Sequence, residues 1–468
     1  MRTKFFALIA LALVPLSAWG ATPTAEPWHS NARAMLEHLV NVPTVVGRDR
    51  VPDVANWLAE QYRLAGFPAD DIKVLPYEHT AALIVRWRAA GKPKLKPIML
   101  MAHMDVVEAK REDWTASDPF TFTEKEGYYY GRGTIDIKQG VTATTMALFE
   151  LKASGFKPAR DVIVFYTGDE ETAGKGAELG ATAWHDLLDV EYGLNSDGGG
   201  GEFAADGQPI GFMLQAAEKT YADYTLTTRN RGGHSSKPRA DNAIYQLANA
   251  LHRLETYRFA PSLNETTRAY FSERAKHEPG PLGDAMRAWV ANPADGKAAD
   301  IIEANESTAG LTRTRCVATR LAGGHADNAL PQLATANINC RIMPGVSPDA
   351  IKDELVSIVA DKGVVVTRND ANVATLASPL RGDIVKAFTD AVHALHPNAP
   401  ILPEMSTGAS DARPFRVKGI PVYGVDGSWV VAPVDLRAHG QDERLPVKAL
   451  GDDVDHWVLM VSKLAGSR

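Results

Sequence analysis

Acidic and imidazole side chains gather where the predicted strands end and where predicted helices begin. Open α/β sheets bind ligands beyond the carboxyl ends of their strands, so side chains at these positions meet in space even when they lie far apart in the chain. One such cluster alone is typical of a solvated turn, but several clusters that each border a core element are not. The residues are His103, Asp105, Asp136, Glu170, Glu171, Asp197 and His439.

Two imidazoles and several carboxylates are ligands that suit borderline divalent cations such as zinc. Two ions about 3.5–4 Å apart need a shared carboxylate, and a carboxylate that binds neither ion can act as a general base. The sequence has no His-Glu-x-x-His motif and no Gly-x-Ser-x-Gly elbow, and Gly176 stands where a phosphate-binding loop needs Ser or Thr. The pattern therefore predicts a pair of divalent cations with a carboxylate base beside them.

Both ends of the chain alternate strand-like and helix-like segments. The continuous apolar run 161–166 is typical of a strand that is buried on both faces of an α/β sheet. Helices are predicted at 28–39, 54–65, 140–154, 383–395 and 447–464, and strands at 81–87, 97–102, 161–166 and 421–425.

The middle of the chain has a different pattern. From about residue 212 the apolar residues alternate with period two, as in 221–228, and a helix is predicted at 243–254. This profile indicates an α+β insertion at 212–344 in a larger α/β domain, with a polar stretch at 259–312 of unknown role. We expect residues 21–211 and 345–468 to form that larger domain, with a mostly parallel central sheet flanked by helices.

The first twenty residues have the features of a secretory signal peptide. Arg2 and Lys4 precede the apolar run 5–14, which is shorter than the roughly 20 residues that a bilayer span needs. Ala18-Trp19-Gly20 then provides a small-x-small cleavage signal. We expect a periplasmic or secreted protein that does not bind membranes after cleavage. The alternative is a membrane anchor that is retained.

The charge of the chain argues against a nucleic-acid partner. Lys and Arg number 50 against 57 Asp and Glu, which gives a formal net charge of −7. Proteins that bind nucleic acid usually present a basic domain or stripe to the phosphates.

Only two cysteines occur in the sequence, Cys316 and Cys340, and both fall in predicted strands. The strands flank a Gly-rich turn region from which the two thiols are about equidistant. Export makes a cross-strand disulfide chemically possible, and two buried free thiols are the alternative, because Cys packs as a small apolar residue.

The order and spacing of the motifs resemble the co-catalytic dizinc metallopeptidase family, which includes glutamate carboxypeptidases, aminoacylases, carnosinase-type dipeptidases and succinyl-diaminopimelate desuccinylase. The resemblance covers nearly all of the expected mature chain. The matching motifs are Met101-Ala-His-Met-Asp-Val-Val107, Trp114 with Asp118-Pro-Phe120, Gly131-Arg-Gly-Thr-Ile-Asp-Ile-Lys138, Gly168-Asp-Glu-Glu171, Arg231-Gly-Gly-His-Ser-Ser236, Asn328-Ala-Leu-Pro331 and Gly408-Ala-Ser-Asp411.

The resemblance implies a zinc-exopeptidase-like catalytic domain that binds two Zn²⁺, with Co²⁺ or Mn²⁺ as alternatives. It implies that Asp136 bridges both ions, that His103 and Asp197 complete one site, and that Glu171 and His439 complete the other.

The resemblance also implies roles beyond the metal ligands. Glu170 would be the general base, and Asp105 would hold the His103 ring in the required tautomer. Relatives often have a non-proline cis peptide after the bridging Asp, here between Asp136 and Ile137.

The insertion resembles the lid of this family, which commonly forms homodimers. The resemblance implies that His234 reaches the active site of a partner subunit and stabilises the developing oxyanion. Substrate-binding candidates are Arg341, which could meet a carboxylate bidentately, and Asn328, Gly408 and Ser410. The alternative for Arg341 is an exposed strand charge.

Together these features predict a secreted zinc exopeptidase or amidohydrolase that hydrolyses an amide beside a free carboxylate. Hydrolysis of a C-terminal peptide bond is the first choice, and N-acyl amino acid deacylation and dipeptide cleavage are alternatives. The substrates would be small peptides or N-acyl amino acids. A non-catalytic peptide- or metal-binding protein is the alternative of another class, but Glu170 and all five expected ligands are present.

Overall fold

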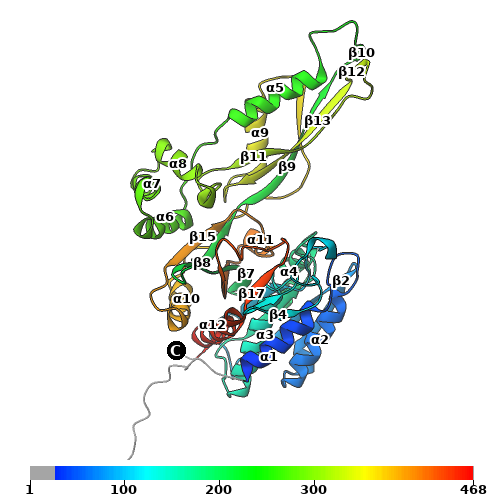
Figure 1. Cartoon of the computed structure of the whole chain (residues 1–468). Helices are drawn as coiled ribbons and strands as arrows, with labels where there is room; N and C mark the ends of the chain where they lie inside the picture. The colour runs from blue at the N-terminus through cyan, green and yellow to red at the C-terminus, as the bar shows by residue number, and fades with distance from the viewer. Residues whose placement is uncertain (1–26, 467–468) are drawn as a thin grey trace, which may run out of the picture.

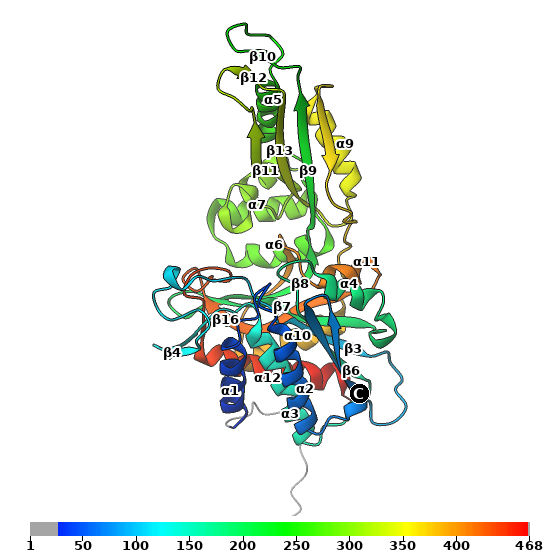
Figure 2. The ribbon, with the colours of Figure 1, turned by 90° about the vertical axis from the view of Figure 1, so that its right-hand side faces the viewer.

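The structure is a computed structural model that describes residues 27–466. A broad α/β part contains both ends of the described chain, and a narrower part made from its middle stands on it (Figures 1 and 2). No helix among the described residues combines the length and the apolar composition of a membrane span. The predicted signal peptide, residues 1–20, lies outside the described residues.

An eight-stranded sheet forms the centre of the α/β part. Its middle strands β6, β3, β7 and β16 are parallel to one another, whereas antiparallel pairs occur towards both edges. The predicted mostly parallel centre is therefore confirmed. The strands, in spatial order, are β1 (Ile72–Tyr77), β2 (Thr80–Trp87), β6 (Val162–Thr167), β3 (Ile98–His103), β7 (Tyr192–Phe203), β16 (Val422–Val431), β8 (Pro209–Glu218) and β15 (Ile401–Ser406).

Helices cover both faces of this sheet. The strands β3 and β6 are buried at every position, as their continuous apolar sequences predict. The larger apolar cluster joins one face of the sheet to α1 (Trp28–Val40), α2 (Val51–Leu64), α3 (Lys138–Ala153), α10 (Gly382–Leu395) and α12 (Val447–Ala465). A smaller cluster joins the other face to α4 (Lys175–Ala181) and α11 (Ala412–Val417).

The narrow part is built on a four-stranded antiparallel sheet. Buried and half-buried residues alternate along β9, and the buried side packs against two helices. A short two-stranded ladder forms the far end of this part (Figure 1). In spatial order the sheet contains β11 (Arg315–Gly323), β13 (Leu333–Ile342), β9 (Thr220–Arg229) and β14 (Val364–Arg368); the helices are α5 (Ala243–Thr256) and α9 (Pro348–Val359), and the ladder is β10 (Gly233–His234) with β12 (Ala329–Leu330).

The bounds of this sheet differ from the predicted insertion, 212–344, at both ends. At the start, β8 pairs with β15 in the central sheet, and the alternating pattern begins only at Thr220. At the end, α9 and β14 follow residue 344, yet β14 pairs with β9. A helix followed by an apolar strand has the same local sequence pattern in the broad part and in the narrow part. Only the long-range strand pairing shows to which part such a segment belongs.

Three helices from the polar stretch 259–312 lie between the two parts. They share an apolar core around Phe271, Met286 and Trp289, and the first of them packs beside β15 at the edge of the central sheet. The helices are α6 (Glu265–His277), α7 (Gly280–Ala291) and α8 (Gly296–Glu303).

Cys316 and Cys340 form a disulfide, which decides between the two alternatives that the sequence left open. The residues lie directly opposite each other in β11 and β13, and their Cα atoms are 4.1 Å apart. The bond ties the edge strand of the narrow part to its neighbour.

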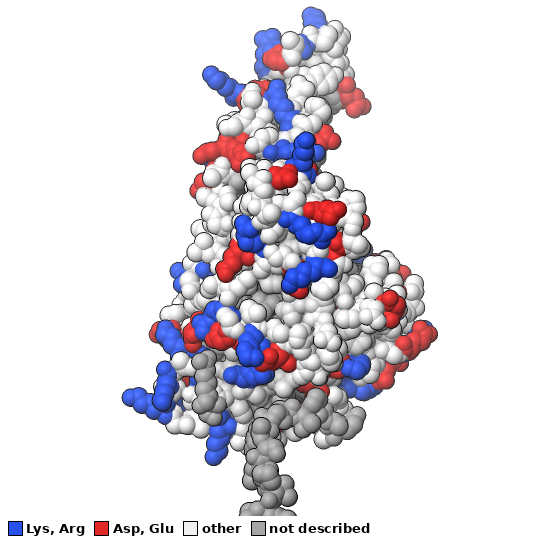
Figure 3. All heavy atoms as spheres, turned by 90° about the vertical axis from the view of Figure 1, so that its left-hand side faces the viewer, with Lys and Arg blue, Asp and Glu red and all other residues white. Residues whose placement is uncertain are grey.

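Acidic and basic side chains are interspersed on the face drawn in Figure 3. The described residues on that face form no continuous basic stripe.

A small three-stranded sheet connects two distant loops of the α/β part. The loop after β5 contains Asp136 and the loop before β17 contains His439, and pairing of β5 with β17 brings these loops together. The strands, in spatial order, are β17 (Arg444–Pro446), β5 (Tyr128–Tyr130) and β4 (Thr123–Lys125).

Candidate dinuclear metal centre

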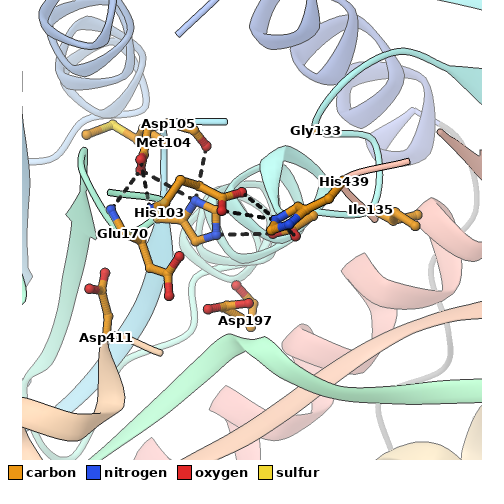
Figure 4. Close-up of polar contacts among 12 residues, drawn as sticks. His103, Met104, Asp105, Gly133, Ile135, Glu170, Asp197, Asp411 and His439 are labelled. Carbon is orange, nitrogen blue, oxygen red and sulfur yellow. Dashed lines mark hydrogen bonds and ion pairs between the residues drawn. The ribbon is translucent and has the colours of Figure 1, made fainter. Parts of the chain in front are cut away.

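The predicted ligands converge at the carboxyl ends of the central strands (Figure 4). His103 is the last residue of β3, and Asp197 lies within β7 beside it. Glu171 follows β6, whereas Asp136 and His439 come from the two loops joined by the small sheet. The strand-end pattern thus accounts for His103 and Glu171, whereas the pairing of β5 with β17 brings Asp136 and His439 to the same place.

Asp136 lies between the two imidazoles. Its Oδ1 atom is 3.2 Å from Nε2 of His103, and its Oδ2 atom is 3.0 Å from Nε2 of His439. The same nitrogen of His439 lies 3.0 Å from a carboxylate oxygen of Glu171. A carboxylate whose two oxygens face different imidazoles is placed to bridge two cations. The peptide bond between Asp136 and Ile137 is cis, as the resemblance implied.

Two overlapping groups of ligand atoms are close enough to hold an ion each. Ligand atoms of His103, Glu170 and Asp197 lie within 4.8 Å of one another, and so do those of His103, Asp136 and Glu171. Nε2 of His103 is buried and makes no hydrogen bond of acceptable geometry to the described residues, although Asp136 is near. A buried nitrogen of this kind, surrounded by carboxylates, fits a metal ligand.

Asp105 connects His103 to the segment that carries Glu170 and Glu171. Nδ1 of His103 is 3.1 Å from the carbonyl oxygen of Asp105 and 3.5 Å from its Oδ1 atom. A proton on Nδ1 leaves the lone pair of Nε2 directed into the site. The carboxylate of Asp105 also accepts hydrogen bonds from the backbone N–H groups of Glu170 and Glu171, at 3.2 and 3.1 Å. Asp105 therefore positions more of the site than the sequence suggested.

The pKa values of the site reflect many carboxylates in a small buried space. Burial, followed by the charge of Asp197, raises the pKa of Glu170 to about 10. Burial also raises the pKa of Asp197 to about 7, with Asp136 adding to the effect. Hydrogen bonds to Asp136 and Glu171 raise the pKa of His439 to about 10. Such a cluster is electrostatically suited to divalent cations, which would offset the mutual repulsion of its carboxylates.

Arg132 and Glu443 form a buried pair that joins the two ligand-bearing loops. Nη1 of Arg132 donates to Oε2 of Glu443 at 2.6 Å. The other carboxylate oxygen of Glu443 accepts from the backbone N–H groups of Gly133, Ile135 and Asp136 at 3.0, 2.9 and 3.3 Å. Nη2 of Arg132 donates to the carbonyl oxygens of His439 and Gly440 at 3.2 and 3.0 Å. The pair thus fixes Asp136 relative to His439.

We expect Glu443→Gln to weaken metal binding by about 10–100-fold, as loss of outer-shell support does elsewhere. The new amide would place an N–H donor against the Arg132 guanidinium, whose charge would stay buried without a partner. Zinc titration against a competing chelator measures the affinity. Glu108→Gln, which removes an exposed pair with Arg48, is the matched control. Equal zinc affinity in Glu443→Gln and the wild type would contradict the positioning role.

The structure does not bring His234 or Asn328 to the metal centre of the same chain. Both belong to the far tip of the narrow part, where β10 and β12 lie (Figures 1 and 2). Nδ1 of His234 accepts a hydrogen bond from the Ser236 backbone N–H at 3.2 Å, and the carbonyl oxygen of Asn328 accepts one from the Ser235 backbone N–H at 3.0 Å.

The remaining substrate-binding candidates also make local contacts. The guanidinium of Arg341 lies 4.9 Å from the ring centroid of Tyr221 on the neighbouring strand β9. The hydroxyl of Ser410 donates to Glu218 at 3.0 Å, and the Gly408 N–H donates to the Ser406 hydroxyl at 3.0 Å. Ser410 and Gly408 therefore shape their loop, and the roles that the resemblance implied for these three residues stay predictions.

Sequence reasoning gave no separate role to Arg132, Asp411 or Glu443. Asp411 is buried, accepts a hydrogen bond from Thr167 and lies beside Glu170 in Figure 4. Burial raises the pKa of Asp411 to about 7. Arg132 and Asp411 lie inside the motifs that resemble the family, and Glu443 follows His439 by four positions. Their closeness in sequence to the expected ligands is therefore the signal that could have identified them.

Comparison with known proteins agrees with this geometry. The chain is 28% identical over 404 residues to a probable carboxypeptidase S-like 2 from Dictyostelium discoideum, covering 81% of this chain and 74% of that protein. It is 29% identical over 368 residues to the human N-fatty-acyl-amino acid synthase/hydrolase PM20D1, covering 76% of this chain and 72% of that protein.

The fold is shared with solved structures. An M20 family metallo-carboxypeptidase from Sulfolobus solfataricus superposes with a TM-score of 0.68 at 18% identity, over 93% of this chain and 99% of that one. Residues 99–463 match the family described as Peptidase family M20/M25/M40. With this match and a cluster able to hold metal ions, the chain is a metal-dependent hydrolase that belongs to peptidase family M20/M25/M40.

Proposed function

We propose that the chain hydrolyses the amide bond that joins an acyl group to the nitrogen of a free amino acid. This reaction includes the release of a C-terminal residue from a small peptide and the deacylation of an N-acyl amino acid. The observation that carries the proposal is Asp136, whose two oxygens face His103 and His439 while Glu170 stands beside the same site.

The donor set fits two zinc ions, with Co²⁺ or Mn²⁺ as alternatives. Asp136 would be shared, His103 and Asp197 would complete one site, and Glu171 and His439 the other. The ions would supply Lewis-acid polarisation of the scissile carbonyl and would acidify water at the site.

The side chains of the site would carry the proton transfers. Glu170 takes a proton from the attacking water as the new C–O bond forms, and it then delivers this proton to the departing nitrogen as the C–N bond breaks. A general base must start deprotonated, so bound cations would have to offset the burial and the charge of Asp197 that raise the pKa of Glu170. The carboxylate of Asp105 keeps Glu170 in place by accepting a hydrogen bond from the Glu170 backbone N–H.

We also propose that the chain works as a homodimer. Since His234 is exposed at the far tip of the narrow part, it could act only in the site of another subunit. His234→Ala and Glu170→Ala chains should each have little activity, and mixed dimers should partly recover it. Mixed dimers without any recovery would argue against sharing of residues between subunits.

Export to the periplasm or the medium is a further part of the proposal. The pattern of residues 1–20 supports it, and the Cys316–Cys340 disulfide is compatible with an oxidising compartment. Fractionation of cells that produce the full chain tests this: recovery only in the cytoplasm would contradict it.

The proposed reaction is tested on the metal-reconstituted protein with a panel of N-acyl amino acids and dipeptides, each paired with its C-terminal amide. We expect release of the free amino acid from the substrates with a free carboxylate and little from the amides. Equal turnover of acid and amide, or no turnover of any substrate, would overturn the proposal. Zinc binding without turnover would favour a non-catalytic binding protein.

A further inference from the structure

The loop 407–411 joins β15 to α11 at the edge of the metal centre. Asp411, the last residue of the loop, accepts a hydrogen bond from the Thr167 hydroxyl and lies beside Glu170 in Figure 4. Thr167 ends β6, the strand that leads into the segment of Glu170. A substrate bound at Glu170 is therefore adjacent to this loop.

Both ends of the loop are attached to the end of β8. At the start of the loop, the Lys219 backbone N–H donates to the carbonyl oxygen of Ser406 at 3.0 Å. At its end, the Ser410 hydroxyl donates to Oε2 of Glu218 at 3.0 Å. The same hydroxyl accepts a hydrogen bond from the Ala412 backbone N–H at 3.2 Å, where α11 begins. Two neighbouring residues, Glu218 and Lys219, thus hold the loop at both ends.

Glu218 is completely buried and faces a cation on its other side. Its Oε1 atom lies 3.3 Å from Nη1 of Arg416 in α11, and the Arg416 side chain is only 1% exposed. Nη2 of Arg416 donates to the carbonyl oxygen of Val422 at 2.7 Å, and its Nε donates to the Ser378 hydroxyl at 3.2 Å. Burial raises the pKa of Glu218, and the charge of Arg416 acts against this shift. Arg416 thus fixes the carboxylate to which Ser410 is bonded.

Stability alone explains the Glu218–Arg416 pair poorly. Both charges lose their contacts with water on burial, so an apolar pair of similar volume is often as stable or more stable. An apolar side chain at position 218 could not accept the hydrogen bond from Ser410. Arg416 also balances the charge of Glu218, which limits the repulsion between Glu218 and an anionic substrate. What the pair adds is therefore a fixed position for the loop.

We propose that Glu218 is a positioning residue, which holds the loop 407–411 where its backbone N–H groups can bind the carboxylate of a substrate. The inference rests on the proposed function and deepens it, because it names a residue on which recognition of the free carboxylate depends. The Ser410 hydroxyl has one proton, and it donates that proton to Glu218. Ser410 then acts through the position of its loop rather than as a donor to the substrate.

The test measures kcat and KM for the N-acyl amino acid that the wild type hydrolyses fastest and, at high enzyme concentration, for its C-terminal amide. In Glu218→Gln, one amide must replace a carboxylate that serves both Ser410 and Arg416. We expect kcat/KM for the acid to fall about tenfold more than for the amide, with most of the change in KM. A factor of ten is about 1.4 kcal/mol, within the range of a hydrogen bond to a charged group.

Glu218→Gln leaves the charge of Arg416 buried without its partner, so we also expect a loss of stability. The double variant Glu218→Met/Arg416→Met removes both charges and the acceptor for Ser410. It should fold and bind zinc as the wild type does, but it should lose the preference for the acid. Glu218→Gln/Arg416→Gln is also uncharged but keeps an acceptor, and it should retain more of that preference. Wild-type preference in Glu218→Met/Arg416→Met would overturn the proposal.

Glu191→Gln is the matched control. Glu191 forms ion pairs with Arg160 and Arg381 directly before β7, at the amino end of that strand, whereas the metal centre lies at the carboxyl ends of the strands. This change should lower the melting temperature and leave the ratio of kcat/KM for acid and amide unaltered. If Glu218→Gln lowers kcat/KM for acid and amide equally, as Glu191→Gln would at most, the pair has only a structural role and the proposal falls.

Failure of the inference is distinguishable from failure of the proposed function. If the wild type hydrolyses acid and amide equally, or neither of them with its full metal content, the proposed function falls and the inference falls with it. If the wild type prefers the acid and both Glu218 variants keep that preference in full, the amide hydrolase stands and the role of Glu218 falls. Zinc content and thermal unfolding, measured for each variant, show that the folded site is being compared.

Discussion

Glu170→Gln should lower kcat for amide hydrolysis by about 10²–10⁴-fold, the usual contribution of a general acid–base group. The amide side chain retains the size of Glu170 but cannot accept a proton from water and pass it to the departing nitrogen. Metal content should stay at the wild-type value, because Glu170 is expected to act beside the ions rather than to bind them. Steady-state kinetics together with mass spectrometry of bound metal check both parts.

The control for this change is Glu178→Gln, which alters an exposed glutamate paired with Lys175 on α4. It should have wild-type kinetics. Since His103, Glu170 and Asp197 have ligand atoms within 4.8 Å of one another, the geometry also permits Glu170 as a ligand. Loss of one ion in Glu170→Gln would assign it that role, and unchanged kcat would remove it from the mechanism.

Asp136→Asn should have the second large effect, a loss of bound metal together with about 10³-fold or more in kcat/KM. The estimate corresponds to several kcal/mol of charge stabilisation by the metal centre, at about 1.4 kcal/mol for each factor of ten. An amide offers one oxygen and an N–H₂ group in place of two carboxylate oxygens. It cannot serve both the His103 side and the His439 side of the site.

Asp189→Asn, an exposed acid that pairs with Lys96, makes the same chemical change away from the site and should leave metal content and kinetics unaltered. Isothermal titration with zinc would separate one binding event from two. If Asp136→Asn binds two ions as tightly as the wild type, Asp136 does not bridge them.

The α/β part could be predicted well because its signals are local. The runs 97–102 and 161–166 become Ile98–His103 and Val162–Thr167, and the helix predicted at 447–464 is Val447–Ala465. Continuous apolar strands and amphipathic helices carry this information in neighbouring residues. The bounds of the inserted part depended on which sheet β8 and β14 join, and such pairing has no local signal.

The site could be predicted as far as its charged residues border core elements. Side-chain atoms of His103 and Asp136 lie 3.2 Å apart although the residues are 33 positions apart in the sequence. His103 ends a predicted strand and Asp136 precedes a predicted helix, so both border core elements. The Arg132–Glu443 pair could not be predicted in this way, because its partners act on backbone groups that carry no sequence pattern.

The central claim is that Asp136 bridges two metal ions, and anomalous X-ray diffraction from crystals of the zinc-loaded protein tests it most directly. The account predicts two peaks at the zinc absorption edge, about 3.5–4 Å apart, on either side of the Asp136 carboxylate. One peak should contact His103 and the other His439. A single peak, or two peaks that Asp136 does not join, would contradict the account.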